Sequence, residues 1–310
     1  MNDVLLNFAF TINAEAPLPE ASTAFLRNML AVVKPKSGVT AGTITRCSTA
    51  AAIANLTDNK EAAAALEAGL SYIYVLPANS LDIAAVIDGA GEDFYTIAIG
   101  SEFTTQEANS RNFGSFEGVV AKSFTVEAEA KAFSAIASQC GFLVNAENGA
   151  VNMFHAFGSL LSAEPWDNRQ YISMPEDDGI IDLGTVNSLY QDRISFALTS
   201  AQYGPRLAFF AAGQQAIIAP YIIKELGIAL QGAAIQYMNI NKPQYTITQA
   251  KLLEDHLQKI LDKYASQGLL EEGKITISLT KQNYEAGALI VVPQPTALWK
   301  IIGNLRQEVK

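Results

Sequence analysis

Large apolar residues recur at every second position near the N-terminus, which predicts a β-strand. They are Val4, Leu6, Phe8, Phe10 and Ile12. The two-residue period places their side chains on one face of the strand, whereas the intervening residues lie on the other face. Residues 14–20 contain two prolines and lead away from the strand, so we expect no hairpin partner directly after it.

A second strand pattern occurs near the C-terminus. Residues 288–292 (ALIVV) form this strand candidate and include Leu289 and Val291. Prolines lie after both strand candidates, so we expect hinges at residues 14–20 and 292–296. A strand close to a chain end either fills a slot in its own sheet or pairs with the sheet edge of another molecule. The sequence alone leaves both alternatives open.

The last apolar segment, residues 297–309, fits two patterns. A helical stripe would consist of Leu298, Ile301, Ile302 and Leu305, whereas a strand would align Ala297, Trp299, Ile301, Gly303 and Leu305. Glycine is unfavourable in the interior of a helix, so we expect an extended arm here.

The middle of the chain alternates between apolar runs and helical patterns. We expect strands at residues 72–76, 94–99, 117–121, 141–145, 170–174 and 193–198, and helices at residues 48–56, 59–70, 81–87 and 126–139. Apolar runs that are separated by helices are typical of a parallel sheet with both faces covered. The sequence therefore predicts a mixed α/β fold, with a largely parallel sheet flanked by helices and extended N- and C-terminal strand arms.

The last third has longer helical patterns. Residues 214–238 predict a long apolar helix, for which a break near Pro220 is left open; the polar residues within it favour a core helix over a membrane span. The next helix begins at Thr246, where Gln249 completes the spacing of a capping box. Its expected core stripe is Leu253, Leu257, Ile260, Leu261 and Tyr264, with a stop at Gly268 and a strand at residues 274–279.

These patterns divide the chain into four regions. We expect an N-terminal arm at residues 1–20, a first α/β region at 21–115, a core region at 116–285 and a C-terminal strand arm at 286–310.

The chain contains few charged residues for its length. Of the 310 residues, 49% are hydrophobic and 17% are charged, against a typical charged share of about 25%. Copies or partners that cover the surface would explain this shortfall, and so would a chain that is merely rich in alanine.

The charge is unevenly distributed along the chain. The net charge is −10; residues 91–178 hold thirteen acidic and four basic side chains, whereas the last thirty residues hold four basic and two acidic ones. An acidic middle argues against nucleic-acid binding, which requires Lys and Arg to displace counterions. From charge, we expect Lys300 and Arg306 to lie nearer an acidic partner than the 91–178 region does.

The sequence offers no catalytic, cofactor or metal site that we can identify. His155 and His256 lack the spacing of metal ligands, and we expect both to be packed or surface residues. No phosphate-binding loop or nucleophile elbow occurs, and the acidic run 176–178 lacks the alternate ligand positions of a calcium loop. Cys47 and Cys140 lie in separate segments, which favours a reduced, intracellular setting, and we find no secretory signal. We therefore expect a protein that is not an enzyme.

The order of several segments resembles that of contractile bacteriophage tail sheath proteins. The Ala-rich helices that lead into a strand ending in proline (48–77) resemble one part of this family, and FYTIAIGSEFTTQ (94–106) and residues 116–144 resemble its α/β core. Residues 166–175, 258–279 and 297–309 resemble its later parts and its C-terminal arm. The resemblance covers most of the chain and implies a short member without large inserted outer domains.

This resemblance implies an architecture and a set of partners. Subunits would form stacked rings around a tail tube, and arms would add strands to the sheets of neighbours. Contraction would release energy stored at assembly, without nucleotide. The interface residues would be Val4, Leu6, Phe8, Phe10, Ile12, Leu289, Val291, Trp299, Ile301 and Leu305, with Lys300 and Arg306 facing the tube. Baseplate and tail-terminator proteins would be further partners; no cofactor, nucleic acid or membrane is implied. The protein would lie in the virion tail, and in the host cytoplasm during assembly.

Two other classes of function stay open. One is another self-assembling virion or shell protein. The other is an α/β enzyme or small-ligand binder, which would carry a pocket near the carboxyl ends of strands such as 72–76.

Overall fold

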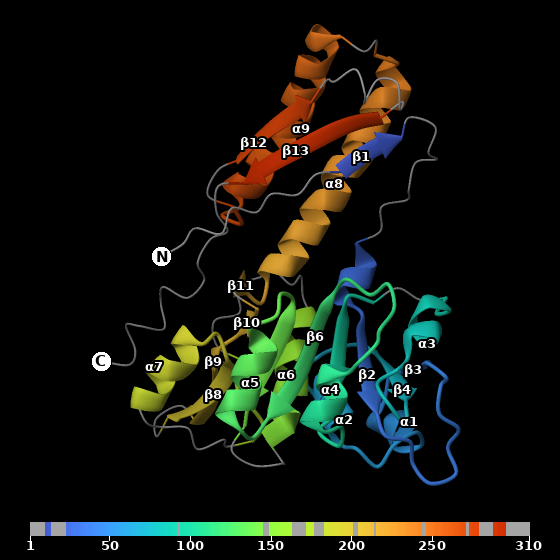
Figure 1. Cartoon of the computed structure of the whole chain (residues 1–310), viewed down its shortest axis with the longest axis vertical. Coiled ribbons are helices and arrows are strands. Elements are labelled where there is room, and N and C mark those ends of the chain that lie inside the picture. The colour runs from blue at the N-terminus through green and yellow to red at the C-terminus, as the bar shows by residue number, and fades with distance from the viewer. Residues whose placement is uncertain are drawn as a thin grey trace. The chain divides into compact units, whose positions relative to one another are not determined.

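A computed structural model describes residues 10–13, 23–91, 94–144, 149–162, 172–176, 183–200, 204–213, 215–243, 246–270, 273–278 and 288–295 (Figure 1). They belong to two compact units. One contains the described residues of 24–220, and the other contains β1 (Phe10–Asn13) together with the described residues of 221–295.

The first unit is built on an eight-stranded sheet. Its strand order is β3-β4-β2-β5-β6-β7-β8-β9, and the neighbours from β4 to β8 are parallel, whereas β3 and β9 add antiparallel at the two ends. This confirms the predicted largely parallel α/β sheet. The strands are β2 (Met29–Val33), β3 (Thr45–Cys47), β4 (Ile73–Pro77), β5 (Thr96–Ile99), β6 (Val119–Phe124), β7 (Gln139–Leu143), β8 (Ser195–Ser200) and β9 (Gly204–Phe209).

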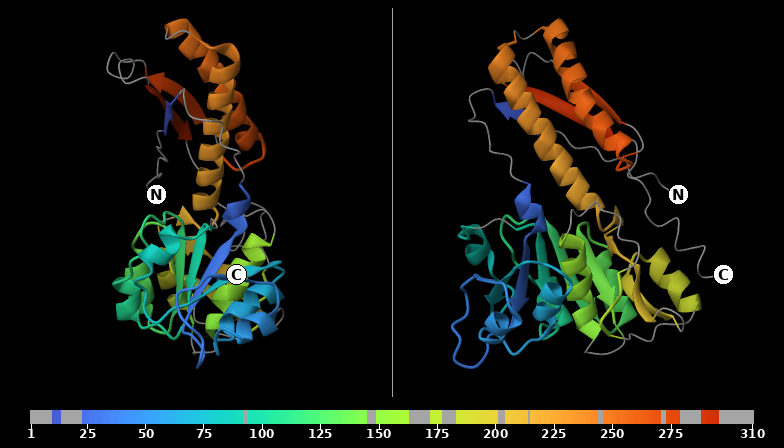
Figure 2. Two further views of the ribbon diagram at one scale, coloured as in Figure 1. Left: turned by 90° about the vertical axis from the view of Figure 1, so that its right-hand side faces the viewer. Right: turned by 180° about the vertical axis from the view of Figure 1, so that it is seen from behind.

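Helices cover both faces of this sheet. With α1, α2 and α6 on one side and α3, α4 and α5 on the other, the left view of Figure 2 shows the three layers. Strands β2, β4, β5, β6 and β7 are buried along their whole length because both faces are covered. The helices are η1 (Ala24–Arg27), α1 (Ala50–Ala54), α2 (Glu61–Glu67), α3 (Ala84–Asp88), α4 (Thr105–Asn109), α5 (Glu127–Ser134), α6 (Ala150–Leu161) and α7 (Leu183–Gln191), and β10 (Ala211–Ala212) pairs with β11 (Gln215–Ala216).

The second unit combines a helical pair with a small antiparallel sheet. It contains α8 (Ala219–Asn241), α9 (Ile247–Ser266), β12 (Gly273–Ser278) and β13 (Ala288–Pro295), and its sheet has the order β1-β13-β12. Helix α9 packs against β12. Four of the five predicted stripe residues of α9 are buried, while Ile260 is half-buried. Within the described residues, no helix is long and apolar enough to cross a membrane.

Several predicted boundaries were wrong. The helix expected at 126–139 ends at Ser134, and Gln139 begins β7 instead. Pro220 lies in the first turn of α8 and does not break it, because the first turn of a helix does not need the missing N–H. Of the strand expected at 170–174, Ser173 forms an isolated bridge with Arg206, and residues 170–171 lie outside the described residues.

Two central elements of the first unit were not predicted. Strand β2 lies in the middle of the sheet between β4 and β5, and helix α6 packs against α2. The expected boundary at residues 115/116 lies between β5 and β6, which are paired neighbours of one sheet.

Candidate functional site

The predicted N-terminal strand pairs with the predicted C-terminal strand. In the antiparallel register, Phe10 lies opposite Val291 and Ile12 lies opposite Leu289. We call β1, β13 and β12 together the arm sheet. The other predicted interface residues lie outside the described residues; they are Val4, Leu6, Phe8, Trp299, Ile301 and Leu305. The predicted tube-facing residues Lys300 and Arg306 also lie outside them.

The prediction of a hinge at residues 292–296 was wrong, because residues 292–295 belong to a strand. Strand β13 continues to Pro295, and Pro293 and Pro295 lie opposite Ile275 and Gly273 of β12. Paired residues in an antiparallel ladder alternate between those that hydrogen-bond to each other and those that point away. The N–H of Ile275 points away from β13, since it donates to a side chain of α9. Its partner Pro293 therefore belongs to a pair that exchanges no hydrogen bonds, and the proline costs β12 no bond.

The same alternation explains where β1 pairs. Val291 lies two residues before Pro293, so the backbone nitrogens of both residues point towards the β1 side of β13. Val291 has an N–H to offer a strand on that side, whereas Pro293 and Pro295 have none. The described ladder between β1 and β13 covers residues 288–291 of β13, which we call the strand slot.

Side chains of α9 occupy the opposite edge of the arm sheet. The backbone N–H of Ile275 donates to Gln258 Oε1 (2.9 Å), and that of Ile277 donates to Glu254 Oε1 (2.8 Å). Gln258 Nε2 donates to the carbonyl of Gly273 (2.9 Å) and to Asp262 Oδ1 (2.8 Å). These contacts were not predicted, although the i, i+4 spacing of Glu254, Gln258 and Asp262 places the three side chains on one face of the helix.

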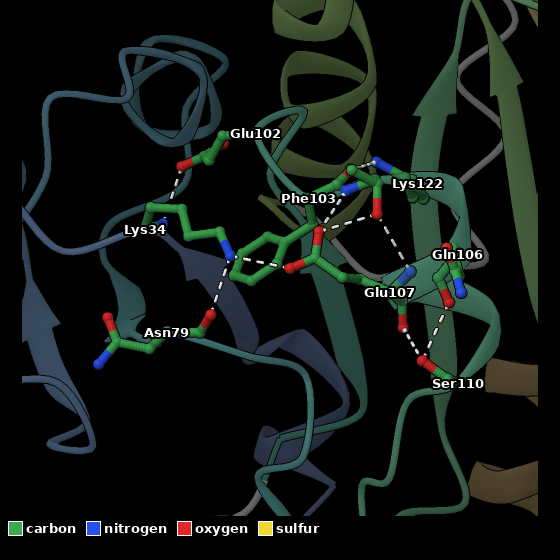
Figure 3. A network of polar contacts seen from close by, with 9 residues as sticks. Lys34, Asn79, Glu102, Phe103, Gln106, Glu107, Ser110 and Lys122 are labelled. Atoms are coloured by element: carbon green, nitrogen blue, oxygen red, sulfur yellow. Dashed lines mark hydrogen bonds and ion pairs between the residues drawn. The ribbon is translucent and has the colours of Figure 1, made fainter.

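A polar network lies at the carboxyl ends of β2, β4 and β5, where open α/β sheets commonly bind ligands. Figure 3 shows Lys34 with its contacts to Glu102, Asn79 and Glu107. The backbone N–H of Lys34 donates to Glu102 Oε1 (2.9 Å), and its Nζ donates to the carbonyl of Asn79 (2.9 Å) and to Glu107 Oε1 (3.0 Å). The ammonium also lies 4.2 Å from the ring centre of Phe103. Lys34 thus ties three loops together.

A complete capping box starts α4 within this network. The backbone N–H of Thr104 donates to Glu107 Oε2 (2.6 Å), and the N–H of Glu107 donates to Thr104 Oγ1 (3.2 Å). The bond from Thr104 and the ion pair with Lys34 lower the pKa of Glu107 to about 2. The spacing T-x-x-E at residues 104–107 is the sequence signal by which this box could have been found.

A second set of carboxylates lies beside the network. Glu61 accepts hydrogen bonds from the hydroxyl and the N–H of Ser101, and Asn59 Nδ2 donates to Glu102. Burial raises the pKa of the Glu61 carboxyl. A pocket of about 630 Å³ is lined by Lys34, Asn59, Glu61, Ser101 and Glu102, among others.

This network fixes loops and has no arrangement for chemistry that we can assign. Its carboxylates accept from backbone and side-chain donors of neighbouring segments. Lys122 is 3% exposed and donates to the carbonyl of Phe103 (2.7 Å), and burial lowers its pKa. Among the described residues, no three His, Cys, Asp or Glu side chains are grouped so that they could hold a metal ion.

The remaining candidate residues differ in burial: the two cysteines are buried, both histidines are half-buried, and Glu176 is exposed. Cys47 and Cys140 are buried, free thiols. His155 lies in α6, where burial lowers its pKa, and the ring of His256 lies 5.2 Å from that of Tyr237. The backbone N–H of Glu176 donates to Asn152 of α6, and the rest of the acidic run 176–178 lies outside the described residues.

Comparisons with known proteins agree on the fold. No protein-family model matches the sequence. A comparison with curated proteins gives no match either. Solved structures do match. A chain of the sheath complex of the extracellular contractile injection system PVC, in the contracted state, is 11% identical with a TM-score of 0.66, over 89% of both chains.

Two further structures match in the same way. A chain of the helical sheath of the anti-feeding prophage, also contracted, is 12% identical with a TM-score of 0.59, over 91% of this chain and 94% of that one. The sheath tail protein from Desulfitobacterium hafniense is 10% identical with a TM-score of 0.54, over 86% of this chain and 92% of that one. Over most of its length, this chain therefore has the fold of contractile sheath proteins.

Proposed function

We propose that this chain is a structural subunit of a contractile tail sheath and that it acts without enzymatic chemistry or a cofactor. The observation that carries the proposal is the arm sheet, in which a strand from near one end of the chain pairs with a strand from near the other. The fold likeness to sheath proteins, at nearly full coverage of both chains, supports it.

In this proposal, the strand slot is filled by β1 of a neighbouring subunit in the assembled sheath. A strand that fills a slot of its own chain can fill the same slot in an identical chain, because every contact of the pair is preserved. The net gain of each ladder bond is about 0.5–1.5 kcal/mol, so a short strand joins subunits firmly without a large interface. Residues 14–20 would act as the hinge that lets the linked bodies rotate during contraction.

The proposal includes partners and a location. Stacked rings of the chain would surround a tail tube, with baseplate and tail-terminator proteins at the two ends. Lys300 and Arg306 would face the tube, because they belong to the basic end of an otherwise acidic chain. The protein would assemble in the host cytoplasm and remain in the virion tail or a tail-like particle.

Deletion of Asn2–Ile12 tests the strand exchange. The truncated protein should keep a folded body, since the eight-stranded sheet contains none of these residues. It should no longer form long tubes, which electron microscopy and pelleting would reveal. A second variant keeps the length of the arm but replaces its apolar face, with serine at Val4, Leu6, Phe8, Phe10 and Ile12. It should also form no long tubes, because the apolar face and not the length of the arm holds the strand in the slot.

Normal tubes from both variants would contradict strand exchange. Closed shells from the intact protein would instead favour another virion component. A small oligomer that binds a ligand in the pocket beside Lys34 would favour a binding protein or an enzyme.

A further inference from the structure

The two edges of the arm sheet differ in what their backbones offer. On one edge, β13 presents the strand slot, in which β1 lies. On the other edge, the outward N–H groups of Ile275 and Ile277 donate to Gln258 and Glu254, which we call the edge caps.

The edge caps match the strand in spacing. Two residues four apart on a helix are separated by about 6 Å along its axis, and two residues two apart on a strand are separated by about 6.8 Å. Glu254 and Gln258 can therefore reach two successive outward N–H groups at once, and α9 runs antiparallel to β12 for them to do so.

Gln258 contacts the backbone of β12 at two groups, whereas Glu254 contacts it at one. Its amide oxygen accepts from Ile275, and its amide nitrogen donates to the carbonyl of Gly273. It thus occupies a donor and an acceptor that an added strand would need. Asp262 accepts from the same nitrogen (2.8 Å) and is a positioning residue for Gln258.

We infer that Glu254 and Gln258 close the β12 edge, so that the arm sheet gains strands on the β13 side only. An open edge presents unpaired backbone groups that pair with another chain, and natural sheets block such edges. Pro293 and Pro295 also limit pairing at the β13 edge, since neither has an N–H to donate to a strand that would continue past Val291. The arm sheet can therefore grow on the β13 side only, where β1 pairs with residues 288–291 of β13.

This inference rests on the proposed function only in saying that the accepted strand belongs to a neighbour. A closed β12 edge would keep the β12 strands of two subunits from pairing with each other. One-sided growth would then lead to an ordered array, whereas two open edges would lead to branched aggregates.

The test compares the unchanged protein with Glu254→Ala/Gln258→Ala. Alanine favours helix, so α9 itself is not weakened. Amide hydrogen exchange at Ile275 and Ile277 should accelerate about tenfold, since each amide loses one hydrogen bond. Sedimentation should show stronger self-association of the variant through β12 edges, and electron microscopy should show irregular aggregates.

Matched variants isolate the edge caps. Asp255→Ala/Gln236→Ala also removes one carboxylate and one amide, but at exposed helix positions, and should behave like the unchanged protein. Glu254→Gln keeps an acceptor for Ile277 and should also behave like it. Gln258→Glu keeps the acceptor for Ile275 but loses the donor to Gly273, so it should open the edge in part.

The outcomes of the two proposals are distinguishable. If Glu254→Ala/Gln258→Ala exchanges and associates like the unchanged protein, the closed edge is overturned, whatever the protein assembles into. If the unchanged protein forms no tubes but the double variant shows faster exchange and aggregation, the edge caps stand and the sheath proposal falls. Should the double variant not fold, the single variant Gln258→Ala, which removes the acceptor for Ile275, is compared with Glu254→Gln by the same exchange measurement. Equal exchange at Ile275 in both would count against the inference.

Discussion

Gly158 illustrates how a single residue fixes the packing of the first unit. It lies in α6 where that helix meets α2, and a Cβ at this position would collide with the backbone of Ala65. Glycine costs a helix about 1 kcal/mol relative to alanine. The close approach of the two helices requires it nevertheless, and an Ala-rich α2 provides the matching small surface.

Gly158→Ala should therefore destabilise the protein despite its better helix propensity. Overpacking against backbone costs about 1–3 kcal/mol, which exceeds the gain of about 1 kcal/mol from propensity. The free energy of unfolding in urea measures the difference. Gly91→Ala is the control, since a Cβ there meets open space; equal or higher stability of Gly158→Ala would show that the helices can move apart.

At the scale of elements, the start and the buried face of α9 could be predicted from the sequence, whereas its contacts with β12 could not. Its start at Thr246 and its apolar stripe were predicted, because capping chemistry and helical period are local properties. Glu254 and Gln258 were not predicted to have a role, since exposed polar residues on a helix are ordinary. Only the position of β12 beside them makes them caps of a sheet edge.

Thr246→Ala should weaken the beginning of α9. Thr246 Oγ1 accepts from the N–H of Gln249 (3.3 Å), and loss of such a cap costs about 0.5–2 kcal/mol. Thr246→Ser keeps the hydroxyl and serves as the control. Urea unfolding compares the two; if both variants are equally stable, the long hydrogen bond contributes nothing.

Strands β2 and β13 show why other elements were missed or misjudged. The run MLAVV of β2 is short and wholly apolar, so it has no period to mark it as a central strand. The prolines of β13 indicate a chain break when the sequence is considered alone. Opposite β12 they fall at positions that need no N–H towards that strand, a condition that only pairing can satisfy.

At the scale of the whole molecule, charge is distributed unevenly along the chain. The chain has a net charge of −10, but its last thirty residues carry a small positive excess. Like-charged subunits repel one another, and a basic segment steers towards acidic surfaces. In the proposed sheath, this basic segment would be the part of the chain suited to an acidic tube surface.

Charge reversal at Lys300 and Arg306 to glutamate should lower the amount of tube that co-purifies with the sheath from intact tails. The same change at the exposed Lys251 and Lys259 of α9 alters net charge equally and should leave the yield unchanged. Equal yields from both double variants would mean that this segment does not face the tube.

The sequence by itself determined the α/β class, the strands at residues 10–12 and 288–292, which lie within β1 and β13, and the start of α9. These depend on periodicity and capping, which neighbouring residues settle among themselves. The tertiary structure decided that Phe10 lies opposite Val291, that Lys34 joins Glu102 and Glu107, and that α9 closes one edge of the arm sheet. The first two of these contacts join residues far apart in the chain. The third joins α9 and β12, which are neighbours in the sequence, but the sequence does not show that the helix lies beside the edge strand. Sequence patterns record burial, whereas the partner of each strand and side chain is selected by packing.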